Sequence, residues 1–334
     1  MTAEFQSHDP LGVLQNTLPV VEKARHVRIN HEKLGKTAEL LAGMEKSMPE
    51  WSNLHPAGCD DAATANLVLV LDALNFCFWT VPNPERKRWS VTYDGTTYDG
   101  YWALAVALRR AMENGVPLAN AEFLAALTEA ELDEILAPDP GCDPILLLHA
   151  RLEHVREVGQ ALLRRWNGSF LLAIDQAGGS PVHLIEMVLH SMPSFRDVVR
   201  HDGQAVRFYK RAQILVADLH SAFAETGPGA FHDMNTLTAF ADYKVPQVLR
   251  SFGILEYSPG LAQQIAEYRL IGVDSDEEIE IRSSTVWSVE YLRQALLERG
   301  TSLASHEIDG RLWQLGQDLT GDVEPYHRTL TVFY

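Results

Sequence analysis

The chain has 334 residues, 46% of them apolar, so it can bury a sizeable core in one large domain or two modest ones. Its 28 Lys and Arg against 45 Asp and Glu give a formal charge of −17, which disfavours a stable nucleic-acid partner. Cys59, Cys77 and Cys142 show no CxxC spacing, so neither a disulfide framework nor structural zinc is predicted, as expected in the cytoplasm. No secretory pattern opens the chain and its apolar runs are too short for a bilayer, so no membrane association is predicted.

Most of the chain carries apolar side chains at three- and four-residue spacing, the pattern of amphipathic helices that face a shared core. This spacing predicts helices over 36–48, 61–75, 101–114, 121–136, 144–166, 182–190, 205–225, 233–239, 244–253, 259–267 and 284–298. Residues 88–100, punctuated by two Asp-Gly pairs, predict a small β-hairpin, and 328–334 alternate like a strand. No linker or repeat divides the chain, so we expect a mainly α, single compact multi-helix unit over residues 1–334.

Familiar cofactor motifs are absent: there is no Walker A loop, GxGxxG, HExxH, GxSxG or EF-hand loop, and no cofactor is predicted. His149 and His154 lie five residues apart and would point to different helix faces, so they predict surface or capping roles rather than a metal pair. The acidic run that starts at Asp274 lacks the spacing of a calcium loop and predicts a solvated helix start. No metal site is therefore expected.

Two segments are the most informative. Lys210 stands near the first turns of a predicted helix, where the dipole disfavours a cation by about 0.3–1 kcal/mol unless an anion accompanies it. A surface lysine with a buried stem is the alternative. Asp242 precedes a helix opened by Pro246 and suits an N-cap. The neighbouring Phe240, Tyr243 and Lys244 suggest a pocket instead, and both readings remain open.

A set of segments in fixed order carries a family resemblance over nearly the whole chain. They are Leu74-Asn-Phe-Cys-Phe-Trp, Phe208-Tyr-Lys-Arg-Ala-Gln-Ile-Leu-Val-Ala-Asp-Leu, Leu237 to Arg250, Glu280-Ile-Arg, Leu312-Trp and Pro325-Tyr-His-Arg-Thr. With these segments the chain resembles the queuosine salvage family of queuosine 5′-phosphate N-glycosylase/hydrolases. The resemblance implies hydrolysis of the N-glycosidic bond of queuosine 5′-phosphate, which releases queuine and ribose 5-phosphate and supplies queuine for tRNA modification.

That family is similar in architecture to helix-hairpin-helix DNA glycosylases, some of which pair a helix-borne lysine with an aspartate in an Asp-x-x-Val-x-x-x-x-Arg-like segment. The segment from Asp242 to Arg250 has that form, and Lys210-Arg-Ala resembles the lysine segment. The 32 residues that separate Lys210 from Asp242 exceed the usual spacing. The resemblance thus implies Asp242 and Lys210 as catalytic residues, with Asp242 either a nucleophile or a stabiliser of the sugar cation.

The chemistry that the resemblance implies calls for residues that bind the substrate, and each candidate has an alternative role in the core, at a helix cap or in a surface ion pair. Stacking on the base is expected from Phe76, Phe78, Trp79, Phe240, Tyr243 and Tyr257. His55 is a further polar candidate, and Asp218, Asp233 and Glu256 are candidate hydrogen-bond acceptors. Phosphate donors are expected among Lys244, Arg282, His327 and Arg328.

Two other functions remain open. A DNA base-excision glycosylase would share the chemistry, although the charge of −17 disfavours a long polyanion. A non-catalytic carrier that binds queuine in an aromatic pocket would need no nucleophile. We expect a metal-independent hydrolase.

Overall fold

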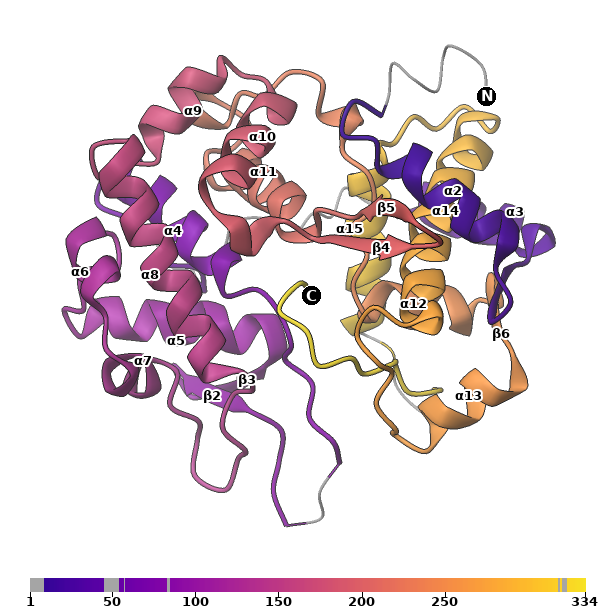
Figure 1. Ribbon diagram of the computed structural model, residues 1–334, viewed down its shortest axis with the longest axis horizontal. Helices are drawn as coiled ribbons and strands as arrows, with labels where there is room; N and C mark the ends of the chain where they lie inside the picture. Colours follow the sequence, from indigo (N-terminus) through magenta and orange to yellow (C-terminus); the bar gives the residue numbers. More distant parts are fainter. Residues whose placement is uncertain (1–8, 45–53, 57, 83–84, 318, 320–322) are drawn as a thin grey trace.

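Helices dominate residues 9–44, 54–56, 58–82, 85–317, 319 and 323–334, which the computed structural model describes (Figure 1). The α-helices are α2 (Val13–Lys23), α3 (Leu34–Ala42), α4 (Asp61–Ala73), α5 (Gly100–Glu113), α6 (Ala121–Ala126), α7 (Glu129–Ile135), α8 (Leu148–Arg165), α9 (Leu171–Ala177), α10 (Pro181–Ser191), α11 (Lys210–Ala222), α12 (Lys244–Ser251), α13 (Pro259–Ala266), α14 (Asp276–Leu297) and α15 (Ser305–Gln317). Short 3-10 turns are η1 (His31–Lys33), η2 (Pro193–Phe195), η3 (Gly227–Gly229) and η4 (Met234–Thr236). The mainly α expectation is confirmed.

The strands form antiparallel pairs rather than a large sheet. They are β1 (Val27–Ile29) with β6 (Leu255–Tyr257), β2 (Ser90–Tyr93) with β3 (Thr96–Asp99), and β4 (Val198–His201) with β5 (Gln204–Arg207). In β2–β3, Tyr93 pairs with Thr96 across the Asp94-Gly95 turn, so the expected hairpin is confirmed.

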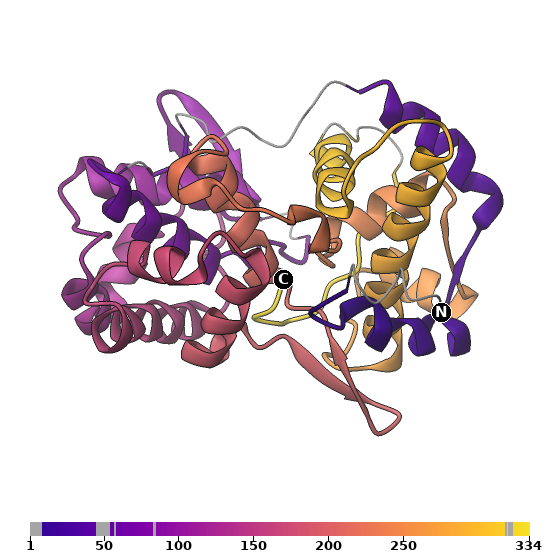
Figure 2. The same cartoon turned by 90° about the horizontal axis from the view of Figure 1, so that it is seen from above.

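The helices gather into two groups with the C-terminal segment between them (Figures 1 and 2). One group holds α4 to α11 and the β2–β3 hairpin, and the other holds α2, α3, α12 to α15 and the β1–β6 pair. The β4–β5 hairpin leaves the first group and packs on α2 of the second. One continuous apolar cluster includes Leu67 of α4 and Leu292 of α14 and so joins both groups. The single domain over residues 1–334 stays a prediction.

Several predicted boundaries are wrong for local reasons. The helix over 121–136 breaks into α6 and α7, because Leu127 is extended with a ψ of 133° and Thr128 opens a new helix through a capping box with Glu131. The start of the predicted helix 205–225 is strand β5, which turns back from β4 at Asp202-Gly203 with φ of 48° and 76°. Such an Asp-Gly pair is a hairpin signal that helical periodicity concealed.

Other predictions failed where tertiary contacts replace regular backbone bonding. Residues 233–239 form only the short turn η4. The C-terminal segment is not a strand: its backbone bonds reach two separate segments, from Ile271 N to Arg328 O at 2.8 Å and from Cys77 N to Tyr334 O at 2.9 Å. Helices α2, α9 and α15 were not predicted.

The acidic start of α14 is only partly solvated. Ser275 caps the helix and Asp276 pairs with Arg25 at 2.5 Å on the surface, as expected for an acidic first turn. Glu278 and Glu280 are buried, which contradicts the solvated reading for them. The Glu280 carboxylate accepts hydrogen bonds from the amides of residues 25–27 and so fastens the chain before β1. Among the described residues, no helix combines the length and apolar character that a bilayer crossing needs.

Candidate active site

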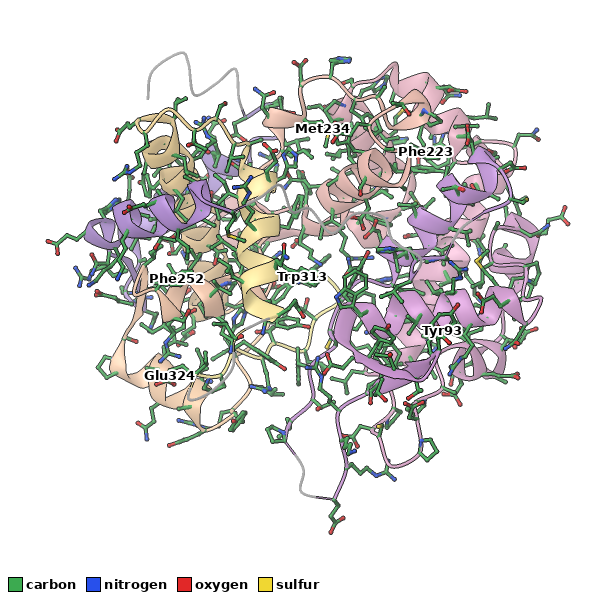
Figure 3. All side chains as sticks on the ribbon, turned by 180° about the vertical axis from the view of Figure 1, so that it is seen from behind. Tyr93, Phe223, Met234, Phe252, Trp313 and Glu324 are labelled. Carbon is green, nitrogen blue, oxygen red and sulfur yellow. The ribbon has the colours of Figure 1, made fainter. Side chains whose placement is uncertain are left out.

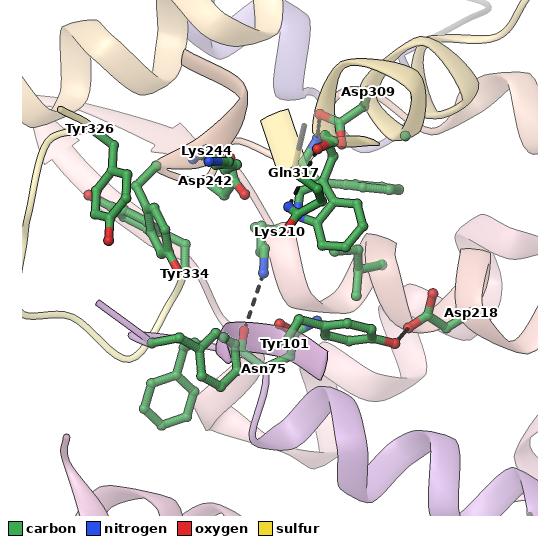
Figure 4. A pocket seen from close by; sticks show the side chains of 18 of the residues that line it. Asn75, Tyr101, Lys210, Asp218, Asp242, Lys244, Asp309, Gln317, Tyr326 and Tyr334 are labelled. Atoms are coloured by element: carbon green, nitrogen blue, oxygen red, sulfur yellow. Dashed lines mark hydrogen bonds between the residues drawn. The ribbon is translucent and has the colours of Figure 1, made fainter. Parts of the chain in front are cut away.

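A pocket lies between the two groups of helices, and side chains from both line it (Figure 4). Its lining consists of His55, Asn75, Phe76, Phe78, Arg88, Asp99, Gly100, Tyr101, Lys210, Ile214, Asp218, Phe240, Asp242, Tyr243, Lys244, Asp309, Gly310, Trp313, Gln317, Tyr326 and Tyr334. The predicted residues that reach it are His55, Phe76, Phe78, Lys210, Asp218, Phe240, Asp242, Tyr243 and Lys244. Sequence segments far apart along the chain therefore meet in one cavity.

Lys210 lies at the centre of the pocket, on the first turn of α11 (Figure 4). Asp197 accepts a hydrogen bond from the Lys210 amide at 3.2 Å, and the buried Lys210 Nζ donates to the backbone oxygen of Asn75 at 3.2 Å. Burial lowers the pKa of the lysine, and the negative charge of Asp242 opposes that shift most. Asp242 is thus the anion that offsets the unfavourable position of Lys210 at the start of a helix.

Asp242 combines the two roles that the sequence left open. Its Oδ1 accepts hydrogen bonds from the amides of Lys244 at 2.9 Å and Val245 at 2.8 Å, at the start of α12. Within the described residues no hydrogen bond reaches Oδ2, so the second oxygen is left for the pocket that Asp242 lines. Burial raises the pKa of this carboxyl, while the cation of Lys210 and the two amides act in the opposite direction.

Asp309 on α15 is a second pocket carboxyl that the sequence prediction missed. Its Oδ1 accepts a hydrogen bond from the Phe240 amide at 3.0 Å, and burial holds its pKa well above the usual value, with the charge of Asp242 adding to the shift. Helical spacing could have identified it. Asp309 lies three residues before Leu312 and four before Trp313, which places all three on one face of a helix. Trp313 itself lies on α15 between the two groups of helices (Figure 3).

At the far side of Lys210 from Asp242, a hydrogen-bonded row joins α11, α5 and the segment before α4 (Figure 4). The Tyr101 hydroxyl donates to Asp218 Oδ2 at 3.4 Å, and His55 Nε2 lies 3.0 Å from that hydroxyl. Burial raises the pKa of Asp218 to about 7, although Lys210 and the Tyr101 hydrogen bond act to lower it. Asp218, one of the expected acceptors, therefore lies in the pocket wall.

The cationic end of the pocket is formed by Lys244 and Arg88. Lys244 Nζ donates to Gln247 at 3.1 Å and lies 6.0 Å from the centre of the Tyr326 ring. Arg88 Nη1 lies 3.2 Å from an Asp99 carboxylate oxygen, which brings it to the end of the β2–β3 hairpin. Burial and the charge on Arg88 both lower the pKa of Lys244, while Asp242 raises it. The positive charge of Arg88 therefore acts on Lys244 within the pocket.

Aromatic rings form much of the wall. Phe76, Phe78, Phe240 and Tyr243 were predicted, and Tyr101 and the rings of Trp313, Tyr326 and Tyr334 join them. Tyr243 and Tyr326 pack with ring centres 4.9 Å apart. Behind the wall, the Arg151 guanidinium lies 4.2 Å from the centre of the Phe76 ring, which fixes that ring from the rear.

The predicted phosphate donors Arg282, His327 and Arg328 do not line the pocket. Arg282 forms a buried two-point ion pair with Asp197, at 2.9 and 2.5 Å. Burial lowers the pKa of His327 to about 3, and its ring packs 5.8 Å from that of Tyr334. Arg328 donates to the backbone oxygens of Thr80 and Tyr326, both at 3.1 Å. These side chains support the wall from behind.

Four further candidates also lie outside the lining. Trp79 is buried in a small cluster with Phe76. Asp233 is exposed, with its carboxylate 3.8 Å from His232. Tyr257 lies on β6 beneath the guanidinium of Arg250, 4.9 Å from the ring centre. The expected acceptor Glu256 likewise binds Asn30, at 2.6 Å, on the β1–β6 pair.

In the part of the chain that the structure describes, no three His, Cys, Asp or Glu side chains are arranged to hold a metal ion. His149 is exposed and pairs with Glu129 at 3.3 Å, whereas His154 is buried against the backbone oxygen of Ala73 at 3.3 Å.

The fold and pocket together define a helical protein with a lysine and several carboxyls enclosed by aromatic rings. Residues 54–334 match the family described as queuosine salvage protein. A Sphaerobacter thermophilus protein named queuosine 5′-phosphate N-glycosylase/hydrolase is 48% identical over 326 residues, 98% of each chain. Proteins of the same name from Mus musculus and Bos taurus are 35% and 36% identical, over 97% and 94% of this chain and 99% and 96% of theirs. The chain belongs to the queuosine salvage protein family.

Proposed function

We propose that this protein hydrolyses the N-glycosidic bond of queuosine 5′-phosphate, releasing queuine and ribose 5-phosphate and thereby supplying queuine for tRNA modification. The names of relatives that match it over nearly their whole length support this substrate. The observation that carries the chemistry is the Asp242 carboxyl, held opposite the buried Lys210 in a pocket walled by aromatic rings.

Cleavage of this bond builds positive charge on the sugar and negative charge on the departing base. Asp242 supplies the anion for the sugar, since its Oδ1 is fixed by two amides and Oδ2 is directed to the pocket. Lys210 favours the ionised form of Asp242 and thereby opposes the effect of burial. Either direct attack on C1′ or stabilisation of the sugar cation with water as the nucleophile is compatible with this carboxylate.

The orientation of the substrate follows from the charges along the pocket. In this proposal the 5′-phosphate lies towards the cations Lys244 and Arg88, the ribose beside Asp242, and the base towards Asp218 and Tyr101, all of which line the pocket. Rings on the wall stack on the base, a contact worth roughly 1–3 kcal/mol per ring. Because queuine has carbon in place of N7, protonation at that position is unavailable, and a proton donor must act elsewhere on the heterocycle.

The similarity to helix-hairpin-helix DNA glycosylases is part of this proposal, supported by the meeting of helix-borne Lys210 with Asp242 at the start of α12. A free nucleotide rather than DNA suits the charge of −17. We place the reaction in the cytoplasm, in keeping with the free thiols of Cys59, Cys77 and Cys142.

The test is to incubate the purified protein with queuosine 5′-phosphate and follow queuine and ribose 5-phosphate by chromatography and mass spectrometry. Release of both products is expected without added metal. Tight binding of queuine without release would establish the carrier instead, and cleavage of a DNA duplex that shifts in a gel would establish the DNA glycosylase. Loss of turnover on chelation, restored by one metal, would overturn metal independence.

Replacement of Lys244 tests the phosphate end. Lys244→Met keeps the apolar stem but removes a charge-assisted contact worth about 1.5–3 kcal/mol, so kcat/KM for queuosine 5′-phosphate should fall by about 10- to 150-fold. With queuosine nucleoside as substrate, the variant and the wild type should differ by far less. Equal losses on nucleotide and nucleoside in steady-state assays would contradict a phosphate contact.

A further inference from the structure

The row formed by His55, Tyr101 and Asp218 has a defined direction. The Tyr101 hydroxyl donates a hydrogen bond to Asp218 Oδ2 at 3.4 Å, which leaves its oxygen to accept one from the protonated Nε2 of His55, 3.0 Å away. His55 is 2% exposed, and its ring packs 5.4 Å from that of Trp102, which fixes the start of the row. Hydrogen bonds in series thus end on one oxygen of Asp218.

The second oxygen of Asp218, Oδ1, is the one that can carry a proton into the pocket. No hydrogen bond from a described residue reaches Oδ1, and Asp218 lines the pocket across Lys210 from Asp242 (Figure 4). Because Oδ2 is occupied as an acceptor, a proton carried by this carboxyl belongs on Oδ1, where a base in the pocket can receive it.

We propose that Asp218 is the general acid of the reaction, a catalytic residue that protonates the departing base, while Tyr101 and His55 are positioning residues. This inference rests on the proposed hydrolysis of queuosine 5′-phosphate. It supplies the donor that a 7-deaza base requires and gives the two carboxyls separate tasks: Asp242 faces the sugar as an anion and Asp218 faces the base as an acid.

The step balances as a hydrolysis. As the C1′–N bond breaks, its electron pair moves into the heterocycle, and the Asp218 Oδ1 proton goes to a nitrogen or the carbonyl oxygen of the base. The hydroxyl of water ends on C1′, either directly or after release of a sugar ester of Asp242. The remaining proton of water passes to solvent, and solvent returns one proton to Asp218.

The groups around Asp218 permit it to hold a proton near neutral pH. Lys210 faces it from the same helix, Tyr101 from α5 and His55 from the segment before α4, and the charge of Asp218 in turn raises the pKa of the buried Asp72 on α4. Burial raises the pKa of Asp218 to about 7, close to the value at which a general acid operates best.

The pH profile of kcat is the first test. Since the acid form is required, kcat of the wild type should fall as pH rises through about 7, the pKa of Asp218. In Asp218→Asn this alkaline limb should vanish and kcat at pH 6 should fall about 10²- to 10⁴-fold. Asp133→Asn, an exposed carboxyl on α7, is the matched control and should retain the wild-type profile.

A substrate that needs no acid separates catalysis from folding or binding. With 4-nitrophenyl ribofuranoside 5-phosphate, whose phenolate leaves unprotonated, Asp218→Asn should stay within a few-fold of the wild type. Tyr101→Phe removes a hydrogen bond that lowers the pKa of Asp218, so its alkaline limb should move to higher pH. If Asp218→Asn does not fold, the Tyr101→Phe profile decides the role.

Equal losses of Asp218→Asn on both substrates, or an alkaline limb unmoved in both variants, would refute the role of Asp218. A rise in KM with the profile intact would reassign Asp218 to base recognition, which also overturns the proposal. Failure of the wild type to release queuine from queuosine 5′-phosphate would instead overturn the proposed function, so the two failures are distinguishable.

Discussion

Asp242→Asn should lower kcat for queuosine 5′-phosphate by about 10²- to 10³-fold, the scale of one lost electrostatic contact to a transition state. Asparagine keeps an oxygen that can accept from the amides of Lys244 and Val245, so the start of α12 should survive. Only the negative charge beside the sugar is removed. The measurement is single-turnover release of queuine, together with the Kd of the substrate on the inactive variant.

Asp242→Ala provides the comparison that separates chemistry from capping. It should lose activity to the same extent and in addition about 1 kcal/mol of stability, because it removes both accepted hydrogen bonds. An Asp242→Asn variant that still releases queuine at near the wild-type rate would return Asp242 to a capping role alone.

Arg282→Met should destabilise the protein by about 3–5 kcal/mol, because it leaves the buried carboxylates of Asp197 and Glu278 without their cation. Asp197 also accepts the amide of Lys210, so the start of α11 should loosen with it. Urea unfolding followed by circular dichroism measures the effect. If the variant folds, its activity should be lower than that of the wild type, because Lys210 is displaced.

The chain offers a matched control in Arg25, whose pair with Asp276 lies on the surface at side-chain exposures of 71% and 42%. Arg25→Met should change stability by no more than about 1 kcal/mol, since exposed ion pairs contribute little. Comparable urea unfolding midpoints for Arg25→Met and Arg282→Met would show that the buried ion pair contributes no more to stability than the exposed one.

Four carboxyls surround Lys210, and three of them, Asp218, Asp242 and Asp309, line the pocket. Asp72, Asp218, Asp242 and Asp309 all have a pKa raised by burial, and Lys210 lowers the pKa of each. Burial therefore favours the protonated form of each carboxyl, and Lys210 favours the ionised form. Opposing influences of this kind allow an acid and an anion to lie in one site.

The sequence by itself determined the helical class and the β2–β3 hairpin, and it singled out Lys210 and Asp242, which both line the pocket. These features depend on local rules: apolar spacing, Asp-Gly turns, and the mismatch between a lysine and the start of a helix. Local spacing also explains why α12 and α4 were placed to within two residues of their ends. The motif segments from Leu74 to the C-terminal Pro325-Tyr-His-Arg-Thr indicated the family. The family match over residues 54–334 confirms it.

Only the tertiary structure decided which candidates share the pocket. Arg282 and His327 have the chemistry of phosphate ligands. In the fold, however, Arg282 forms an ion pair with Asp197, and His327 is buried beside Tyr334. Asp309 and Tyr101 carried no motif and reach the pocket because α15 and α5 face each other from the two groups of helices. Helical periodicity identifies which face of a helix is buried, but it does not identify the element that covers that face. The covering element is determined by packing between segments that are distant in the sequence.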